Sequence, residues 1–182
     1  LVANEGEPNA AYTNDPEGSI SIIDIRSGIP KLTQENVKTL DFKNAPTSIK
    51  GSIRTPNATV AQDLEPEYIA VNANSTLAAV TCQETNVIVY IDLATDKIIR
   101  YAGLGFKDYT LESNKVDFSD KDGGIRLKNW NVKGVYQPDA IAAYMANGKN
   151  YFVTANEGDS REYKGYSSET RLKNLKLDKE AF

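Results

Sequence analysis

The sequence predicts an all-β protein, and more narrowly a β-propeller fragment of roughly two to three four-stranded blades with long inserted loops. Three observations predict this fold class. Two motifs recur at a nearly constant spacing, short runs rich in β-branched and aromatic residues alternate with turn-forming residues, and long polar segments separate some of these runs. Short strands at close spacing are typical of sandwiches, barrels and propellers, and a repeated four-stranded unit favours the propeller.

The repeat consists of two motifs that occur twice in the same order. Glu65–Val71 resembles Gln137–Ala143, and the prolines of these two segments are 138 − 66 = 72 positions apart. Ala79–Glu84 resembles Phe152–Glu157, and the glutamates that close them are 157 − 84 = 73 positions apart. Self-similarity at a fixed spacing indicates that one supersecondary unit has been copied along the chain.

One complete blade is expected at residues 63–101. Its strands are expected at 67–72, 76–82, 87–93 and 97–101. The third of these is rich in apolar and β-branched residues, as a buried propeller strand would be. Asn, Asp, Ser and Thr fill the gaps between the strands, and these residues form turns because their side chains bond nearby main-chain groups.

Partial blades are expected on both sides, at residues 1–43 and 137–182. The tetrapeptide Ala-Asn-Glu-Gly begins at Ala3 in the first and at Ala155 in the second, so it marks equivalent strand ends. The further strands expected in these two partial blades are 19–25, 37–42, 140–145 and 151–155.

Two inserted connections, 44–62 and 102–136, account for a period longer than an ordinary blade. A short helix is expected near 172–182. Two or three blades cannot close a ring, and the chain starts within an expected strand. We therefore expect residues 1–182 to be one partial propeller domain cut from a longer protein.

Composition excludes several functions. The chain has 182 residues, a net charge of −4 and no histidine. An acidic chain without a basic stripe is a poor candidate for binding nucleic acid, and no apolar run approaches the length of a membrane helix. Without histidine there is no Ser–His–Asp triad and no His-ligated metal within these residues. The single cysteine, Cys82, is expected to be buried in a strand.

Blade topology brings acidic residues to one end. In an up-and-down meander, the start of the first strand and the turn between the second and third strands lie at the same end of the blade. Carboxylates of three blades should therefore meet at one rim, where a cation or basic partner would relieve their repulsion. The candidate ligand-binding residues are Glu5, Asp63, Glu65, Glu84, Asp139, Glu157, Asp159 and Arg161.

Calcium is the metal that this rim would select, because hard cations prefer oxygen ligands and the chain offers neither histidine nor a cysteine cluster. The loop at 117–124 alternates oxygen donors before a glycine turn and is expected at the same rim. The candidate metal ligands are Asp120, Asp122 and Glu157.

Other interpretations of these residues remain open at this stage. One alternative is that the acids cap turns and face water, and another is that a pair of them acts as acid and base. Arg161 could contact an anionic ligand, although a surface ion pair is the stronger expectation. Trp130 could stack on a sugar, but blade packing is the stronger expectation.

Several longer motifs resemble a known family, the choice-of-anchor I domain. They are Val2–Pro8, Asp63–Ala70, Leu104–Asp108, Tyr136–Ala142 and Thr154–Tyr163. The relatives include cell-surface glycoproteins of biomineralising mesenchyme cells and bacterial proteins labelled surface-layer or alkaline phosphatase. The resemblance implies an extracellular propeller held at the cell surface, and it makes calcium handling an expectation. The phosphatase label finds no support in these residues, which offer no histidine for metal.

The first functional hypothesis is therefore a non-enzymatic cell-surface or secreted module that binds a partner at the acidic rim, with Ca²⁺ as the candidate cofactor and no catalytic residue. Expected partners are a cell-surface or matrix component and the rest of the parent propeller or another copy of the chain, without nucleic acid or membrane insertion. The alternative is a metal-dependent phosphoesterase-like or lactonase-like hydrolase at the propeller mouth. A purely structural surface-layer unit is the third hypothesis.

Overall fold

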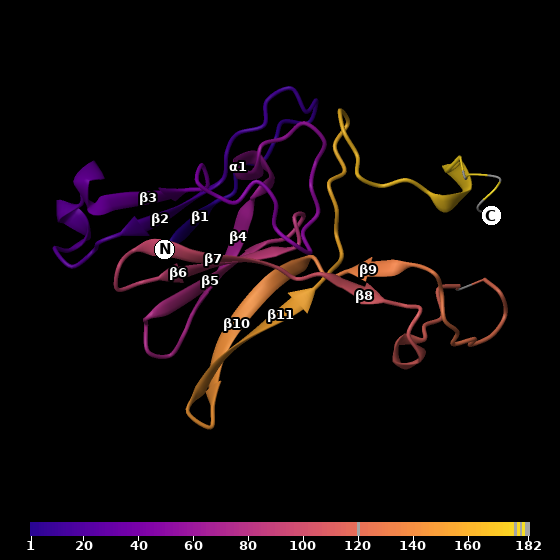
Figure 1. Ribbon diagram of the computed structural model, residues 1–182. Coiled ribbons are helices and arrows are strands. Elements are labelled where there is room, and N and C mark those ends of the chain that lie inside the picture. Colours follow the sequence, from indigo (N-terminus) through magenta and orange to yellow (C-terminus); the bar gives the residue numbers. More distant parts are fainter. Residues whose placement is uncertain (120, 177, 179, 181–182) are drawn as a thin grey trace.

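The protein is all-β in the computed structural model, which describes residues 1–119, 121–176, 178 and 180. Its strands are β1 (Val2–Asn4), β2 (Ser19–Ile23), β3 (Val37–Asp41), β4 (Pro66–Val71), β5 (Leu77–Cys82), β6 (Val87–Asp92), β7 (Lys97–Gly103), β8 (Phe106–Asp108), β9 (Lys133–Val135), β10 (Pro138–Ala146) and β11 (Lys149–Asn156). The described strands form antiparallel sheets in the orders β1-β2-β3, β4-β5-β6-β7, β8-β9 and β10-β11 (Figure 1).

The helices are short. The α-helix α1 spans Val60–Asp63, and 3-10 turns lie at Ile29–Lys31, Gln34–Asn36, Glu112–Asn114 and Leu172–Asn174. Thr59 caps α1 by accepting a hydrogen bond from the backbone N–H of Gln62, whose side-chain oxygen accepts one from the Thr59 N–H. The helix expected near 172–182 is thus one 3-10 turn, and 177, 179, 181 and 182 lie outside the described residues. No helix in the described part of the chain is long and apolar enough to cross a membrane.

The central sheet, β4–β7, confirms the four strands expected between residues 67 and 101. Side chains close its turns as expected. Asn72 Oδ1 accepts hydrogen bonds from the backbone N–H groups of Thr76 and Leu77, and Asp92 Oδ1 accepts them from Ala94 and Thr95. These local bonds favour the turn over continued strand.

The two flanking sheets also confirm the expected strands. β1-β2-β3 places Ala3 opposite Ile20, and the hairpin β10-β11 places Ala143 opposite Phe152. The spacing expected between the two copies of the second motif was wrong by one residue. Cys82 pairs with Pro66 and Asn156 pairs with Pro138, so the second motif is offset by 156 − 82 = 74 positions in space and not by 73.

This shift by one residue changes which acids are equivalent. A one-residue slip moves every side chain of a strand to the other face. In the observed register, Glu5, Gln83 and Glu157 each follow an equivalent strand-end residue, namely Asn4, Cys82 and Asn156. Glu84 is therefore not the counterpart of Glu157.

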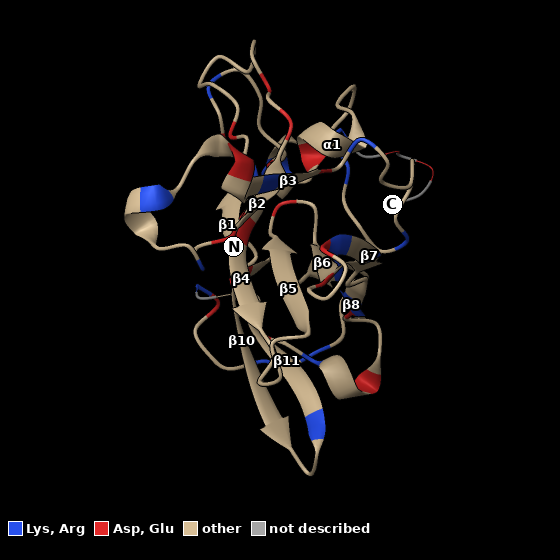
Figure 2. Cartoon of the chain, turned by 90° about the vertical axis from the view of Figure 1, so that its left-hand side faces the viewer, with Lys and Arg blue, Asp and Glu red and all other residues tan. Residues whose placement is uncertain are grey.

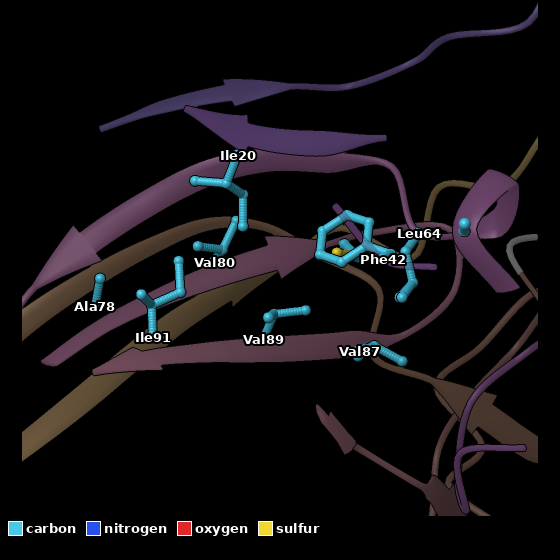
Figure 3. Close-up of a cluster of buried hydrophobic side chains, with 10 residues drawn as sticks. Ile20, Phe42, Leu64, Ala78, Val80, Val87, Val89 and Ile91 are labelled. Carbon is cyan, nitrogen blue, oxygen red and sulfur yellow. The ribbon is translucent and has the colours of Figure 1, made fainter. Parts of the chain in front are cut away.

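The central sheet buries both of its faces. On one face, Val80, Val89 and Ile91 pack against Ile20 and Phe42 of the first sheet and its connection (Figure 3). On the other face, Ala70, Ala79 and Ile88 pack against Ile141 of β10 and Phe152 of β11. Cys82 is fully buried in β5, as expected. Alternate residues of one strand thus enter two different cores, as the two-residue period of a strand requires.

The connection 102–136 differs from a plain loop, because it contains the sheet β8-β9 and extends away from the other sheets (Figure 1). The blade packing expected of Trp130 was wrong. Its ring lies 5.7 Å from that of Phe118 within the same connection, and its Nε1–H donates a hydrogen bond to the Val116 carbonyl. The Lys128 ammonium lies 4.0 Å from the centre of the Trp130 ring.

Candidate functional site

The acidic residues expected at one rim meet where β1 and β5 finish and where β4 and β10 begin. Figure 2 shows acidic segments in the loops around α1 and beyond the end of β5. The central members are four glutamates from three segments of the chain, and we call them the carboxylate cluster. They are Glu5, Glu65, Glu67 and Glu84.

Burial and mutual repulsion weaken the acidity of this cluster. Burial raises the pKa of Glu65 to about 8, and the negative charge of Glu84 adds to the effect. Burial also raises the pKa of Glu67 to about 8, with the charges of Glu84, Glu5 and Asp139 contributing. The pKa values of Glu84 and Glu5 are raised as well, mainly by burial. The charged forms of these groups therefore lack sufficient solvent or basic partners.

Three members of the cluster carry an unsatisfied oxygen. The Oε2 atoms of Glu65, Glu67 and Glu84 are buried and have no hydrogen-bond partner among the described residues. Buried polar atoms are paired in the great majority of folded proteins, so three orphaned oxygens in one cluster call for an explanation. A ligand that supplies positive charge or hydrogen-bond donors would provide it.

Arg161 is the one cation that the described residues place inside this region. Its side chain is 3% exposed, and its Nη2 lies 3.1 Å from Glu65 Oε1 and 3.0 Å from the Asp63 carbonyl oxygen. The expectation of a surface ion pair was therefore wrong. One guanidinium cannot neutralise four carboxylates, so the cluster keeps an excess of negative charge when its members are ionised.

The segment that carries Arg161 is held by backbone contacts with the loop after β1. Gly165 N–H donates to the Ala10 carbonyl at 3.0 Å, and a Cβ atom on Gly165 would lie 1.9 Å from the Ala11 oxygen. Only glycine fits this close approach. Tyr12 packs against Tyr163 and Tyr166 in the same contact.

Asp63 has a structural role within the site. Its side chain is 1% exposed, accepts a hydrogen bond from Thr55 N–H at 3.1 Å and forms an ion pair with Arg54. Its carboxylate is therefore already satisfied, unlike those of the carboxylate cluster.

The remaining candidate ligand residues lie at the edge of the cluster. Asp139, Glu157 and Asp159 are exposed. Glu157 Oε2 accepts a hydrogen bond from Gln83 Nε2 at 3.2 Å, which bridges the hairpin and the central sheet. The negative charges of Asp139 and Asp159 raise the pKa values of Glu67 and Glu84, respectively.

The loop at 117–124 does not join the cluster as expected. Asp122 Oδ2 lies 2.8 Å from Arg126 Nη1, and Asp117 accepts backbone hydrogen bonds from Ser119 and Arg126, so both acids serve their own loop. Asp120 lies outside the described residues. Within the described ranges, no group of three or more His, Cys, Asp or Glu side chains is already gathered closely enough to hold a metal ion.

Sequence reasoning missed Tyr12 and Asp15 as neighbours of this site, where they lie close to Arg161 and Tyr163. The pKa of Tyr163 is raised by burial and by the charges of four glutamates, led by Glu65. The pKa of Asp15 is raised by burial and by Asp63, while Arg161 opposes the change. Their proximity depends on the contact between residues 9–14 and 161–166, which no local pattern in the sequence signals.

Comparison with known proteins identifies the family. The family model described as the Choice-of-anchor I domain matches residues 1–182, which is the whole chain. Searches of curated proteins and of solved structures gave no match. The chain therefore belongs to the choice-of-anchor I domain family, whose domains are associated with the cell surface.

Proposed function

We propose that the chain is a segment of a non-enzymatic, extracellular surface propeller that binds a cationic ligand at the carboxylate cluster. The single observation that carries the proposal is the set of buried, unpartnered oxygens on Glu65, Glu67 and Glu84. They belong to a surface-associated domain, so a ligand outside the cell or on its surface would meet them.

The propeller part of the proposal rests on how the sheets pack. The central sheet has one neighbour on each face, the first sheet and the hairpin. The strand pairing in each flanking sheet is equivalent to part of the pairing in the central sheet. In particular, β10 pairs with β11 as β4 pairs with β5. The described strands form no closed ring, so the remaining blades are proposed to come from further sequence of the same kind.

Calcium is the first candidate for the ligand, because the donors are oxygen atoms only and hard cations prefer such donors. The cluster fits a cation in its chemistry and in its unsatisfied atoms. The carboxylates are not yet gathered around one point, so we infer that their side chains rotate toward the ion on binding.

The test is a thermal melt of the chain in EDTA, in Ca²⁺ and in Mg²⁺, repeated with Glu84→Gln. A cation bound only by the folded state raises the melting temperature as its concentration passes the dissociation constant. We expect a Ca²⁺-dependent rise that Glu84→Gln removes and that Glu17→Gln, at an acid outside the cluster, leaves unchanged. Identical melting curves in EDTA and in Ca²⁺ would contradict the calcium proposal.

A hydrolase that uses the cluster as acid and base is the competing proposal. The specific observation that favours it is the raised pKa of Glu67 beside Glu84, because a carboxylic acid that keeps its proton near neutral pH can act as a general acid. Turnover of phosphoester or lactone substrates that is lost in Glu84→Gln would favour this function over the binding module.

A further inference from the structure

A cavity of about 410 Å³ lies beside the segment that carries Arg161, since Gly165 and Tyr166 of that segment line it. Its lining includes Tyr12, Asp15, Asn57, Gln62 and Tyr166, and none of the four cluster glutamates. It is large enough for a small organic ligand. This cavity has no part in the function proposed above.

Three segments far apart in the sequence hold the walls of this cavity. Asn9 Oδ1 accepts hydrogen bonds from the backbone N–H groups of Thr13 and Asn14, which fixes the loop that carries Tyr12. Gln62 Nε2 donates to the Asp15 carbonyl at 2.7 Å and joins this loop to α1. The third wall, with Tyr166, is fixed by the contact between Gly165 and Ala10.

The chemistry of the lining is that of a receptor for an organic cation. Asp15 forms no ion pair with any described residue, and its Oδ1 is buried without a hydrogen-bond partner. The ring centres of Tyr12 and Tyr166 lie 5.0 Å apart, and both residues line the same cavity as Asp15. Aromatic faces attract cations through their quadrupole, and a carboxylate supplies both opposite charge and hydrogen-bond acceptors.

We propose that the cavity lined by Tyr12, Asp15 and Tyr166 binds a primary ammonium group, as carried by a lysine side chain or an amino sugar. A metal ion fits less well, because only one carboxylate lines the cavity and two aromatic rings replace further oxygen ligands. Arg161 acts on the charge of Asp15 without forming an ion pair with it, so an ammonium group, unlike a neutral sugar, would supply both a paired positive charge and hydrogen-bond donors.

Calorimetric titration and ring-proton NMR of the whole chain test the proposal with two ammonium probes, lysine amide and glucosamine. N-acetylglucosamine is the neutral control, because acetylation removes the positive charge and keeps the sugar ring. Asp15→Asn removes the charge of the cavity and keeps its shape. Glu17→Gln is the matched control, since this acid is close in sequence but does not line the cavity.

We expect at least one ammonium probe to bind, to shift the Tyr12 and Tyr166 resonances and to bind at least about tenfold more weakly to Asp15→Asn. The stronger probe identifies the source as a protein side chain or an amino sugar. Glu17→Gln should bind as the unmodified chain does. Because these probes contain no metal ion, a failure here is distinct from a failure of the calcium proposal. Equal binding of N-acetylglucosamine, no binding of either ammonium probe, or an unchanged affinity in Asp15→Asn would overturn the inference.

Discussion

The central sheet and the hairpin β10-β11 share a sequence motif but not the same surroundings. In the central sheet, Val80 and Ala79 face opposite ways and both are fully buried, because a neighbouring sheet covers each face. In the hairpin, Ile141 faces the central sheet and is only 4% exposed, whereas Tyr144 and Val153 lie on the other face and are about half exposed. The motif thus determines the strands, while neighbouring sheets determine what is buried.

Removing the ion pair that joins these two regions should lower the free energy of unfolding more than any other change considered below. Arg161 follows the hairpin and pairs with Glu65 at the start of the central sheet. Arg161→Ala leaves Glu65 buried without its cation, and removal of one partner of a buried ion pair destabilises a protein by about 3–5 kcal/mol. Urea unfolding at alkaline pH measures this loss. The control is Arg26→Ala, because Arg26 is exposed, and equal stability of the two variants would contradict the role of Arg161.

Shortening a β-branched side chain to alanine should destabilise the central sheet much more than the hairpin. Ile91 is fully buried in the central sheet, and Ile91→Ala should lower the free energy of unfolding by about 2–5 kcal/mol through lost burial and a cavity. Val153 is 53% exposed on the hairpin, and Val153→Ala should change stability by less than about 0.5 kcal/mol. Urea denaturation of both variants compares the regions directly. A large loss in Val153→Ala would mean that its face is covered in solution.

The strands were predictable because their signals are local. Asn72 and Asp92 form turns with residues a few positions away, and the run Val87–Ile91 is rich in β-branched residues. The expected strand limits agree with the structure within two residues. The register was less predictable. The glutamates Glu84 and Glu157 look equivalent in sequence, yet pairing across the sheet offsets them by one residue.

Only the part of the candidate site that follows from strand direction was predictable from the sequence. Alternating strand direction brings Glu5, Glu65 and Glu84 to one end, and the structure places them together. The burial of Arg161 and the tyrosine contacts around Tyr12 depend on two loops more than a hundred residues apart. Such packing leaves no periodic pattern, so composition and spacing could not reveal it.

The carboxylate cluster should make stability depend on pH in a direction opposite to that of ordinary acids. The pKa values of Glu65 and Glu67 are about 8 in the folded chain and near the usual 4.5 when it is unfolded. Between these values the folded state binds more protons, so the free energy of unfolding falls as pH rises from about 5 to about 8. Melting curves across this range should show the fall, and Glu67→Gln should flatten it. A curve that rises with pH and is unaffected by Glu67→Gln would contradict the role of burial.

The smallest expected effect concerns the outer face of the hairpin. Tyr144 and Tyr151 pair across β10 and β11 with their rings stacked at 5.2 Å. A cross-strand aromatic pair on an exposed face contributes about 0.2–1 kcal/mol, so the coupling energy from a double-mutant cycle of Tyr144→Ala and Tyr151→Ala should lie in this range. Unfolding at two protein concentrations sharpens the comparison with the central sheet. If the cost of either substitution grows with concentration, a second molecule covers this face; if it stays constant, the face is exposed to solvent as the structure shows.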